Sequence, residues 1–236
     1  MLINYAHRGA SAYYPENTMS AFYAGLRMGA NGIETDIHRT RDGVLVLFHD
    51  DTLERVTEGS GAVTDCTYEE LLALTVCNRE TGRRDKIVRF EDFLRYFSFR
   101  DLTFAVELKQ DHVERETIEL LEAYGMREKT VLTSFHFDNL RRAREIHPGY
   151  RLGGLTDLAD EAALEQLRAI GAEEICPRAQ TVRPEDVRRW HAQGLSVRAW
   201  GVYTPELMRE MCRCGVDGMT VNFPDLLTAC LQEGRE

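Results

Sequence analysis

Three acidic residues lie in two strand-like stretches at spacings that could bring their carboxylates together. Glu34 and Asp36 are two residues apart in GIETDIH (32–38), and Glu107 lies in TFAVELK (103–109). Residues two apart on a strand point to the same side, so these carboxylates converge if both strands present that side to one cavity. Converging carboxylates repel each other unless a cation lies between them, and Mg²⁺ or Ca²⁺ prefers such oxygen ligands. The alternative is that both stretches carry ordinary solvated pairs.

Two histidines directly follow apolar stretches and are therefore expected at the same edge as the carboxylates. His7 follows INYA, and His49 follows VLVLF. Two imidazoles that face each other can take a proton from a nucleophile and give one to a leaving alkoxide. Arg8 and Lys109 would supply positive charge for an anionic substrate. With a metal ion, these residues indicate a site that cleaves a phosphate ester. We expect the other histidines to be structural: His38, His112, His136, His147 and His191.

Charge and composition limit the classes of partner. The 236 residues carry a formal net charge of −10, a field that repels nucleic acid and anionic membranes. We therefore predict a small-molecule substrate, no nucleic-acid partner and no stable membrane association. The six cysteines have no disulfide-framework spacing, and we find neither a signal peptide nor a long apolar run, so we predict a cytoplasmic protein with reduced thiols. The oligomeric state stays open, a homodimer included.

Eight strand-like stretches alternate with amphipathic, helix-like stretches, in which apolar residues recur every three or four positions. The expected strands are 3–7, 32–38, 103–109, 130–135, 151–156, 173–178, 196–202 and 217–222. Asn17 is expected to cap the first helix, Pro184 and Pro205 to lie in first helical turns, and Gly125 and Gly194 to follow helix ends. This pattern predicts an α/β fold of the TIM (β/α)₈ barrel type. The lack of G-x-G-x-x-G after the first strand disfavours a doubly wound sheet.

One region interrupts the alternation. Residues 43–101 are too many for a single loop between a strand and a helix, and they contain strand-like, turn-rich and helical pieces. We interpret them as a small insertion after the second strand of a single domain, 1–236. In such barrels the reactive groups lie at the C-terminal ends of the strands. Cys212 and Cys214 are expected on opposite faces of a helix, a poor arrangement for zinc.

Several motifs follow one another in a fixed order along the chain. Residues 6–63, AHRGASAYYPENTMSAFYAGLRMGANGIETDIHRTRDGVLVLFHDDTLERVTEGSGAV, contain HRG, PENT, E-x-D, T-x-D-G, and HD followed by L-x-R-x-T-x-G-x-G. TYEELLAL, AVELK, VRAWGV and CGVDGMTVNFPD follow. Together these motifs strongly resemble those of the glycerophosphodiester phosphodiesterases of the bacterial cytoplasmic type. The resemblance covers essentially the whole chain.

The resemblance implies a TIM barrel that hydrolyses a glycerophosphodiester, a deacylated phospholipid, to sn-glycerol 3-phosphate and an alcohol. It implies one divalent cation, Mg²⁺ or Ca²⁺, with Mn²⁺ as a further candidate. The matching positions give His7 and His49 as the general acid/base pair, Glu34, Asp36 and Glu107 as metal ligands, and Arg8, Lys109 and Trp200 as substrate or phosphate contacts. Whether water attacks directly or the glycerol 2-hydroxyl attacks first stays open, as does the preferred alcohol.

Three short stretches depart from the usual family pattern. They are Gly201–Tyr203 after the tryptophan, Val221 with Asn222, and Arg89 in KIVRFEDFL. All lie outside the implied catalytic set, so we expect them to affect recognition of the substrate rather than the reaction. The alternative function is a lysophospholipase D or cyclising phospholipase-like activity on acylated substrates. A non-catalytic barrel is a third hypothesis, which the complete set of implied catalytic residues disfavours.

Overall fold

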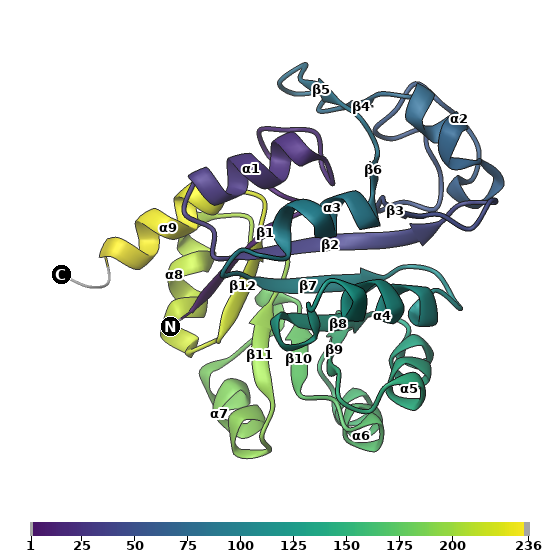
Figure 1. The fold of residues 1–236 in the computed structure, drawn as a ribbon. Coiled ribbons are helices and arrows are strands. Elements are labelled where there is room, and N and C mark those ends of the chain that lie inside the picture. The colour runs from purple at the N-terminus through teal and green to yellow at the C-terminus, as the bar shows by residue number, and fades with distance from the viewer. Residues whose placement is uncertain (1, 234–236) are drawn as a thin grey trace.

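The computed structural model describes residues 2–233, and in them eight parallel strands form a closed barrel surrounded by helices (Figure 1). Around the barrel the strands are β1 (Ile3–His7), β2 (Gly32–Arg39), β7 (Thr103–Leu108), β8 (Thr130–Ser134), β9 (Arg151–Thr156), β10 (Glu174–Pro177), β11 (Ser196–Ala199) and β12 (Gly218–Val221). Strand β1 pairs in parallel with both β2 and β12, which closes the barrel. The predicted TIM barrel is confirmed.

Helices cover the outside of the barrel. They are α1 (Met19–Arg27), α3 (Phe90–Phe97), α4 (Glu114–Ala123), α5 (Phe137–Ile146), α6 (Glu161–Ile170), α7 (Pro184–Ala192), α8 (Pro205–Cys214) and α9 (Pro224–Glu233), with short 3₁₀ helices at Arg127–Lys129 and Ala179–Thr181. Pro184 and Pro205 begin their helices, as predicted. Gly125 and Gly194 follow the ends of α4 and α7 with φ of +65° and +83°, where glycine is favoured. These predicted helix boundaries are confirmed.

The predicted cap of the first helix is wrong. The N-cap of α1 is Thr18, whose extended backbone lets its side chain accept a hydrogen bond from the Ala21 backbone N–H. Asn17 instead has a φ of +56°, which is unlike the extended conformation of a capping residue. Its side chain donates to Asp36 Oδ2 at 2.8 Å. The residue therefore contacts one predicted metal ligand, Asp36, rather than the helix end.

Strand β11 is shorter than the predicted 196–202, although β1 and β9 have their predicted bounds. It ends at Ala199, and Trp200 pairs with its neighbour Arg178 only through an isolated bridge. Gly201 then adopts a φ of +71°, which turns the chain out of the strand. This turn ends the strand directly beside the rim of the barrel.

A polar network fills the middle of the barrel, where many TIM barrels carry branched apolar residues. Arg198 is only 2% exposed, and it donates to Glu174 Oε1 at 2.8 Å and to Thr220 Oγ1 at 2.7 Å. Its guanidinium also lies 5.2 Å from the centre of the Tyr5 ring. A buried charge is tolerated when it is paired and hydrogen-bonded in this way. Arg198 and Thr220 of this network also line the cavity described below.

The predicted insertion contains several small elements. They are β3 (Leu45–Leu47), a 3₁₀ helix at Val63–Asp65, α2 (Tyr68–Ala73), β4 (Val76–Cys77), β5 (Arg84–Asp85) and β6 (Val88–Arg89). They lie at the end of the barrel toward which β2 points (Figure 1). Helix α3 also falls within 43–101, but its Phe93 packs against Phe22 of α1 and Phe104 of the barrel strand β7. Helix α3 therefore serves as the barrel helix after β2, and the inserted part ends at β6.

His49 reaches the barrel rim by a different route from the one expected. Strand β3 is antiparallel to β2, with Leu47 beside Ile37 and Leu45 beside Arg39. The strand therefore begins beyond the rim and runs back toward it. The backbone N–H of Phe48 then donates to the Asp36 carbonyl, which brings His49 to the carboxylates.

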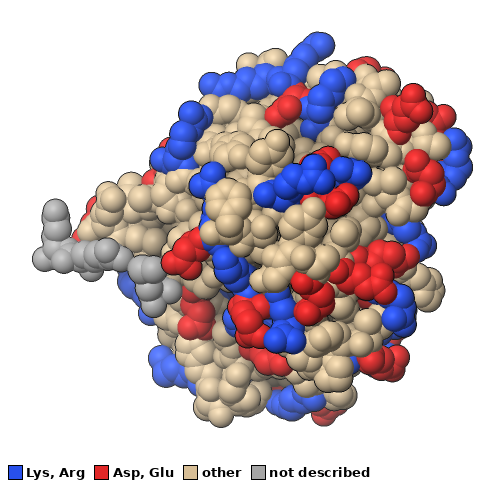
Figure 2. Space-filling model, in the orientation of Figure 1, with Lys and Arg blue, Asp and Glu red and all other residues tan. Residues whose placement is uncertain are grey.

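The surface mixes both signs of charge. Figure 2 shows acidic and basic side chains interspersed over one face of the molecule. All six cysteines are free thiols. No helix within residues 2–233 is long and apolar enough to cross a membrane.

Candidate active site

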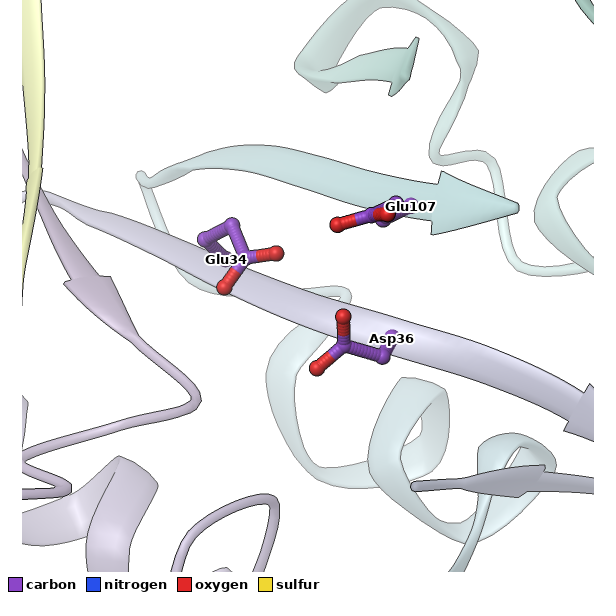
Figure 3. A group of neighbouring side chains, drawn as sticks. All are labelled: Glu34, Asp36 and Glu107. Carbon is purple, nitrogen blue, oxygen red and sulfur yellow. The ribbon is translucent and has the colours of Figure 1, made fainter. Parts of the chain in front are cut away.

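The three predicted acidic ligands meet at the C-terminal end of the barrel. Glu34 and Asp36 from β2 and Glu107 from β7 point toward one another (Figure 3). One oxygen of each lies within 4.8 Å of the others, and all three residues are buried. The register explains this meeting, because β2 and β7 pair in parallel with Asp36 beside Glu107. Asp36 Oδ1 is buried and has no hydrogen-bond partner among the described residues, so this donor set fits a hard divalent cation.

The carboxyl groups differ in pKa because they share a buried space. Burial, with the nearby Asp36, raises the pKa of Glu34 well above its ordinary value. The same two causes raise the pKa of Glu107 to about 7, although Lys109 opposes them. Burial would also raise the pKa of Asp36, but Arg8 and other cations outweigh it and lower that pKa. Carboxylates this close cannot all ionise readily without a further positive charge.

Arg8 and Lys109 contact the carboxylates from two sides. Arg8 Nε lies 3.2 Å from Asp36 Oδ2, and Lys109 Nζ donates to Glu107 Oε1 at 2.9 Å. Arg8 has a φ of +54°, an uncommon conformation for a residue with a side chain. The next residue, Gly9, has a φ of +83°, and a Cβ there would lie 2.4 Å from the backbone of Ala21 in α1. Only glycine fits this turn, which directs Arg8 into the site.

His7 lies at the end of β1 between a carboxylate and an amide. Its Nδ1 is 2.5 Å from Asn222 Oδ1, and its Nε2 is 3.8 Å from Glu34 Oε2. Because the amide oxygen only accepts, His7 carries its proton on Nδ1 when neutral. Burial, assisted by Arg8, lowers the pKa of His7 to about 3. The ring is therefore neutral at pH 7, with its Nε2 lone pair toward the site.

His49 has a carboxylate partner instead. Its Nδ1 lies 2.6 Å from Asp50 Oδ1, which leaves Nε2 for the cavity. Burial lowers the pKa of His49, while Asp36 and Asp50 oppose this shift. An adjacent carboxylate stabilises the imidazolium form and fixes the ring orientation. The two predicted acid/base residues thus have chemically different partners.

Several of these residues line one cavity of about 220 Å³. They include His7, His49 and the predicted ligands Glu34 and Glu107. The lining also contains apolar and aromatic side chains, which are Phe135, Leu155, Trp200 and Tyr203. Arg198 and Thr220 also line it. A larger hollow of about 730 Å³ adjoins the cavity and shares Phe135 and Leu155 with it.

Trp200 lies in the cavity wall, although its N–H is already used. Its Nε1 faces the backbone carbonyls of Thr156 and Cys176, at 3.3 and 3.1 Å. The ring makes an edge contact with Phe135, with centroids 5.3 Å apart. The N–H of Trp200 is therefore occupied by backbone partners, while the residue lines the cavity.

Sequence reasoning missed several residues that contact the site. Asn17 had been interpreted only as a helix cap, and Asn222 as a departure outside the catalytic set. The structure adds that Asn222 contacts His7 directly. Glu16 also contacts the site, because its Oε1 accepts a hydrogen bond from Arg8 at 3.0 Å. Asp50 lies next to His49 in the HD motif, a signal that could have identified it.

The chain is similar to known proteins over nearly its whole length. Residues 7–226 match the model of the "Glycerophosphoryl diester phosphodiesterase family". The chain belongs to the glycerophosphoryl diester phosphodiesterase family. Members of this family are phosphodiester hydrolases, and the predicted resemblance is confirmed. A glycerophosphodiester phosphodiesterase from Caldanaerobacter subterraneus subsp. tengcongensis is 30% identical over 236 residues, which cover 97% of each chain.

Solved structures agree with this family membership. A putative glycerophosphoryl diester phosphodiesterase from Silicibacter pomeroyi has a TM-score of 0.91 and 25% identity, and covers 100% of this chain and 94% of its own. A phosphodiesterase from Oleispira antarctica, solved with the product sn-glycerol-3-phosphate, has a TM-score of 0.89 and 24% identity. It covers 98% of this chain and 97% of its own, and this likeness concerns the fold.

Proposed function

We propose that this member of the glycerophosphoryl diester phosphodiesterase family hydrolyses glycerophosphodiesters to sn-glycerol 3-phosphate and an alcohol. The observation that carries the proposal is the meeting of a buried carboxylate cluster and two imidazoles at one cavity. The family match and the relatives named for this activity support it. The site residues in this proposal are those predicted from the sequence.

Glu34, Asp36 and Glu107 are the proposed ligands of one divalent cation. Mg²⁺ and Ca²⁺ prefer oxygen ligands, which these three carboxylates provide. Asp36 Oδ1 is buried without a hydrogen-bond partner among the described residues, which supports this fit. When bound, such an ion would stabilise the negative charge that develops on the phosphate oxygens. The experiment below distinguishes among Mg²⁺, Ca²⁺ and Mn²⁺.

The chain's own residues account for substrate binding and proton transfer. Arg8 and Lys109 would bind the phosphate, since both carry positive charge beside the carboxylates. His7 Nε2 would accept a proton from the attacking hydroxyl, because Asn222 occupies Nδ1. His49 Nε2 would donate a proton to the leaving alkoxide, because Asp50 stabilises its charged form. The same roles serve whether water or the glycerol 2-hydroxyl attacks.

A panel of substrates and metals tests this proposal. Purified protein is incubated with glycerophosphocholine, glycerophosphoethanolamine or glycerophosphoglycerol, and with Mg²⁺, Ca²⁺, Mn²⁺ or EDTA. Release of glycerol 3-phosphate that depends on the ion is expected. No release with any ion would contradict the proposal. Faster turnover of lysophosphatidylcholine than of glycerophosphocholine would favour the alternative lysophospholipase D activity.

We extend the proposal to the setting of the enzyme. Its substrates are small and water-soluble, and we propose that the chain acts on them in the cytoplasm as a single domain. Cell fractionation tests the location. A single cooperative unfolding transition in calorimetry is expected for one domain, and two separable transitions would contradict it.

A further inference from the structure

Arg55, in the inserted segment, contacts two carboxylates at once. Its guanidinium donates to both oxygens of Glu16, at 2.8 and 2.6 Å. It also donates to both oxygens of Asp50, at 2.5 and 3.0 Å. The planar, forked guanidinium suits such paired contacts, which fix the geometry of both carboxylates.

Each of these carboxylates in turn contacts a proposed site residue. Asp50 Oδ1 lies 2.6 Å from His49 Nδ1, and Glu16 Oε1 accepts a hydrogen bond from Arg8 at 3.0 Å. His49 follows β3 of the insertion, whereas Arg8 follows β1 of the barrel. A continuous series of alternating charges therefore joins the two residues through Arg55.

The insertion's own small core fixes Arg55. Its neighbours Leu53 and Val56 are buried, at 1% and 7% exposure, in an apolar cluster that includes Phe48 and Val63 of the same segment. The Arg55 side chain itself is 46% exposed. Its partners Glu16 and Asp50 are more buried, at 15% and 24% exposure. Ion pairs with a solvent-exposed arginine contribute little to stability, so we attribute to Arg55 mainly the positioning of these two carboxylates.

A second set of contacts joins the insertion to the loop after β1. Asn78 Nδ2 contacts the carbonyls of Ser11 and Tyr14, at 3.0 and 3.2 Å. Arg83 donates to the carbonyl of Tyr13 at 2.8 Å. The loop that carries Arg8 is thus supported by the insertion at more than one place.

We propose that Arg55 is a positioning residue that fixes His49 and Arg8 relative to each other, so that the insertion completes the active site. This inference rests on the proposed function, in which His49 donates a proton and Arg8 binds the phosphate. A misplacement of about 1 Å in a reactive group can cost about 10²-fold in rate. Arg55 needs no contact with the substrate to have this effect.

The test compares Arg55 with Arg41, which lies in the turn between β2 and β3, just before the insertion. Arg55→Ala should lower kcat for glycerophosphocholine by about 10- to 100-fold, the range for partners that orient a functional group. Arg41→Ala is the matched control, because Arg41 is also exposed and contacts Glu70 and the Asp65 carbonyl of the insertion. Arg41→Ala should leave kcat unchanged. Arg55→Lys should remain well below wild type, since a lysine keeps the charge but lacks the fork.

Chemical rescue separates positioning from general stabilisation. Methylguanidinium should restore part of the kcat of Arg55→Ala and none to Arg41→Ala, because it can occupy the place between Glu16 and Asp50. Both alanine variants should have similar small shifts in Tm. Wild-type kcat in Arg55→Ala or Arg55→Lys would overturn the proposal. The proposal would also be overturned if Arg55→Ala loses kcat together with a large fall in Tm and methylguanidinium does not restore that kcat. If wild-type protein releases no glycerol 3-phosphate, the proposed function itself fails, which is a separate result.

Discussion

The different partners of the two histidines predict that His49→Ala affects substrates according to their leaving group. Asp50 opposes the lowering of the His49 pKa by burial, whereas burial assisted by Arg8 lowers the pKa of His7 to about 3, so His49 is assigned to protonate the departing alkoxide. The alkoxide of choline is strongly basic and needs that proton. The anion of p-nitrophenol is stable and leaves without one, so the variant should discriminate between the two classes of substrate.

The size of the effect follows from the acid role and the exposure of the ring. General acid catalysis contributes about 10²- to 10⁴-fold. The His49 side chain is 29% exposed, so water can reach its position in the alanine variant and donate a proton in its place. We therefore expect the lower end, a loss of about 10²-fold in kcat for glycerophosphocholine. With bis(p-nitrophenyl) phosphate the loss should be small.

His7→Ala is the matched variant for this assay. His7 is assigned to activate the nucleophile, which both substrates need, so its loss should lower kcat for both. Glycerol 3-phosphate release and p-nitrophenolate absorbance report the two reactions. Equal losses on both substrates in His49→Ala would refute the assignment of His49 as the acid. A loss confined to glycerophosphocholine in His7→Ala would show that the roles are reversed.

Three further predictions concern the ligands, a histidine partner and the barrel interior. Because the pKa of Glu107 is raised to about 7, protons compete with the cation for this carboxylate below that pH. The affinity for Mg²⁺, measured by calorimetry, should therefore weaken about tenfold from about pH 8 to pH 6. An affinity that stays constant over this range would contradict the prediction. Asn222→Ala should lower kcat by about 2- to 10-fold, because it removes a neutral hydrogen bond that orients His7. An unchanged kcat would exclude this role of Asn222. Arg198→Met leaves Glu174 buried without its partner and should lower the free energy of unfolding, measured with denaturant, by about 3–5 kcal/mol. The double variant Arg198→Met with Glu174→Gln should recover much of that loss. Equal stability of the single and double variants would argue against the ion pair.

Local patterns predicted much of this architecture for a clear reason. Strand and helix alternation depends on side-chain periodicity, which is visible in any short window of sequence. The two-residue spacing of Glu34 and Asp36 likewise implied that both face one side. Parallel pairing of β2 and β7 then brought Glu107 to them, as the barrel prediction required. The predicted positions of His7 and Arg8 followed from the end of β1 in the same way.

Long-range contacts could not be predicted from local sequence patterns, because their partners are far apart in the chain. Asn222 lies 215 residues from His7, and Arg55 lies 39 residues from Glu16. Asn17 resembled a helix cap because Asn is a common capping residue, and only the folded backbone shows its side chain on Asp36. His49 was expected at the rim, but the antiparallel course of β3 that brings it there depends on pairing with β2.

The sequence by itself thus determined the barrel, its family and the identity of the residues that could do the chemistry, since these depend on local periodicity and motif spacing. The tertiary structure decided which partner each of those residues has. It paired His7 with an amide 215 residues away and joined the insertion to the β1 loop through Arg55, whereas the carboxylate partner of His49 is its neighbour in the sequence. Hydrogen-bond partners are selected by distances of about 3 Å, and only closure of the barrel brings such distant segments that close.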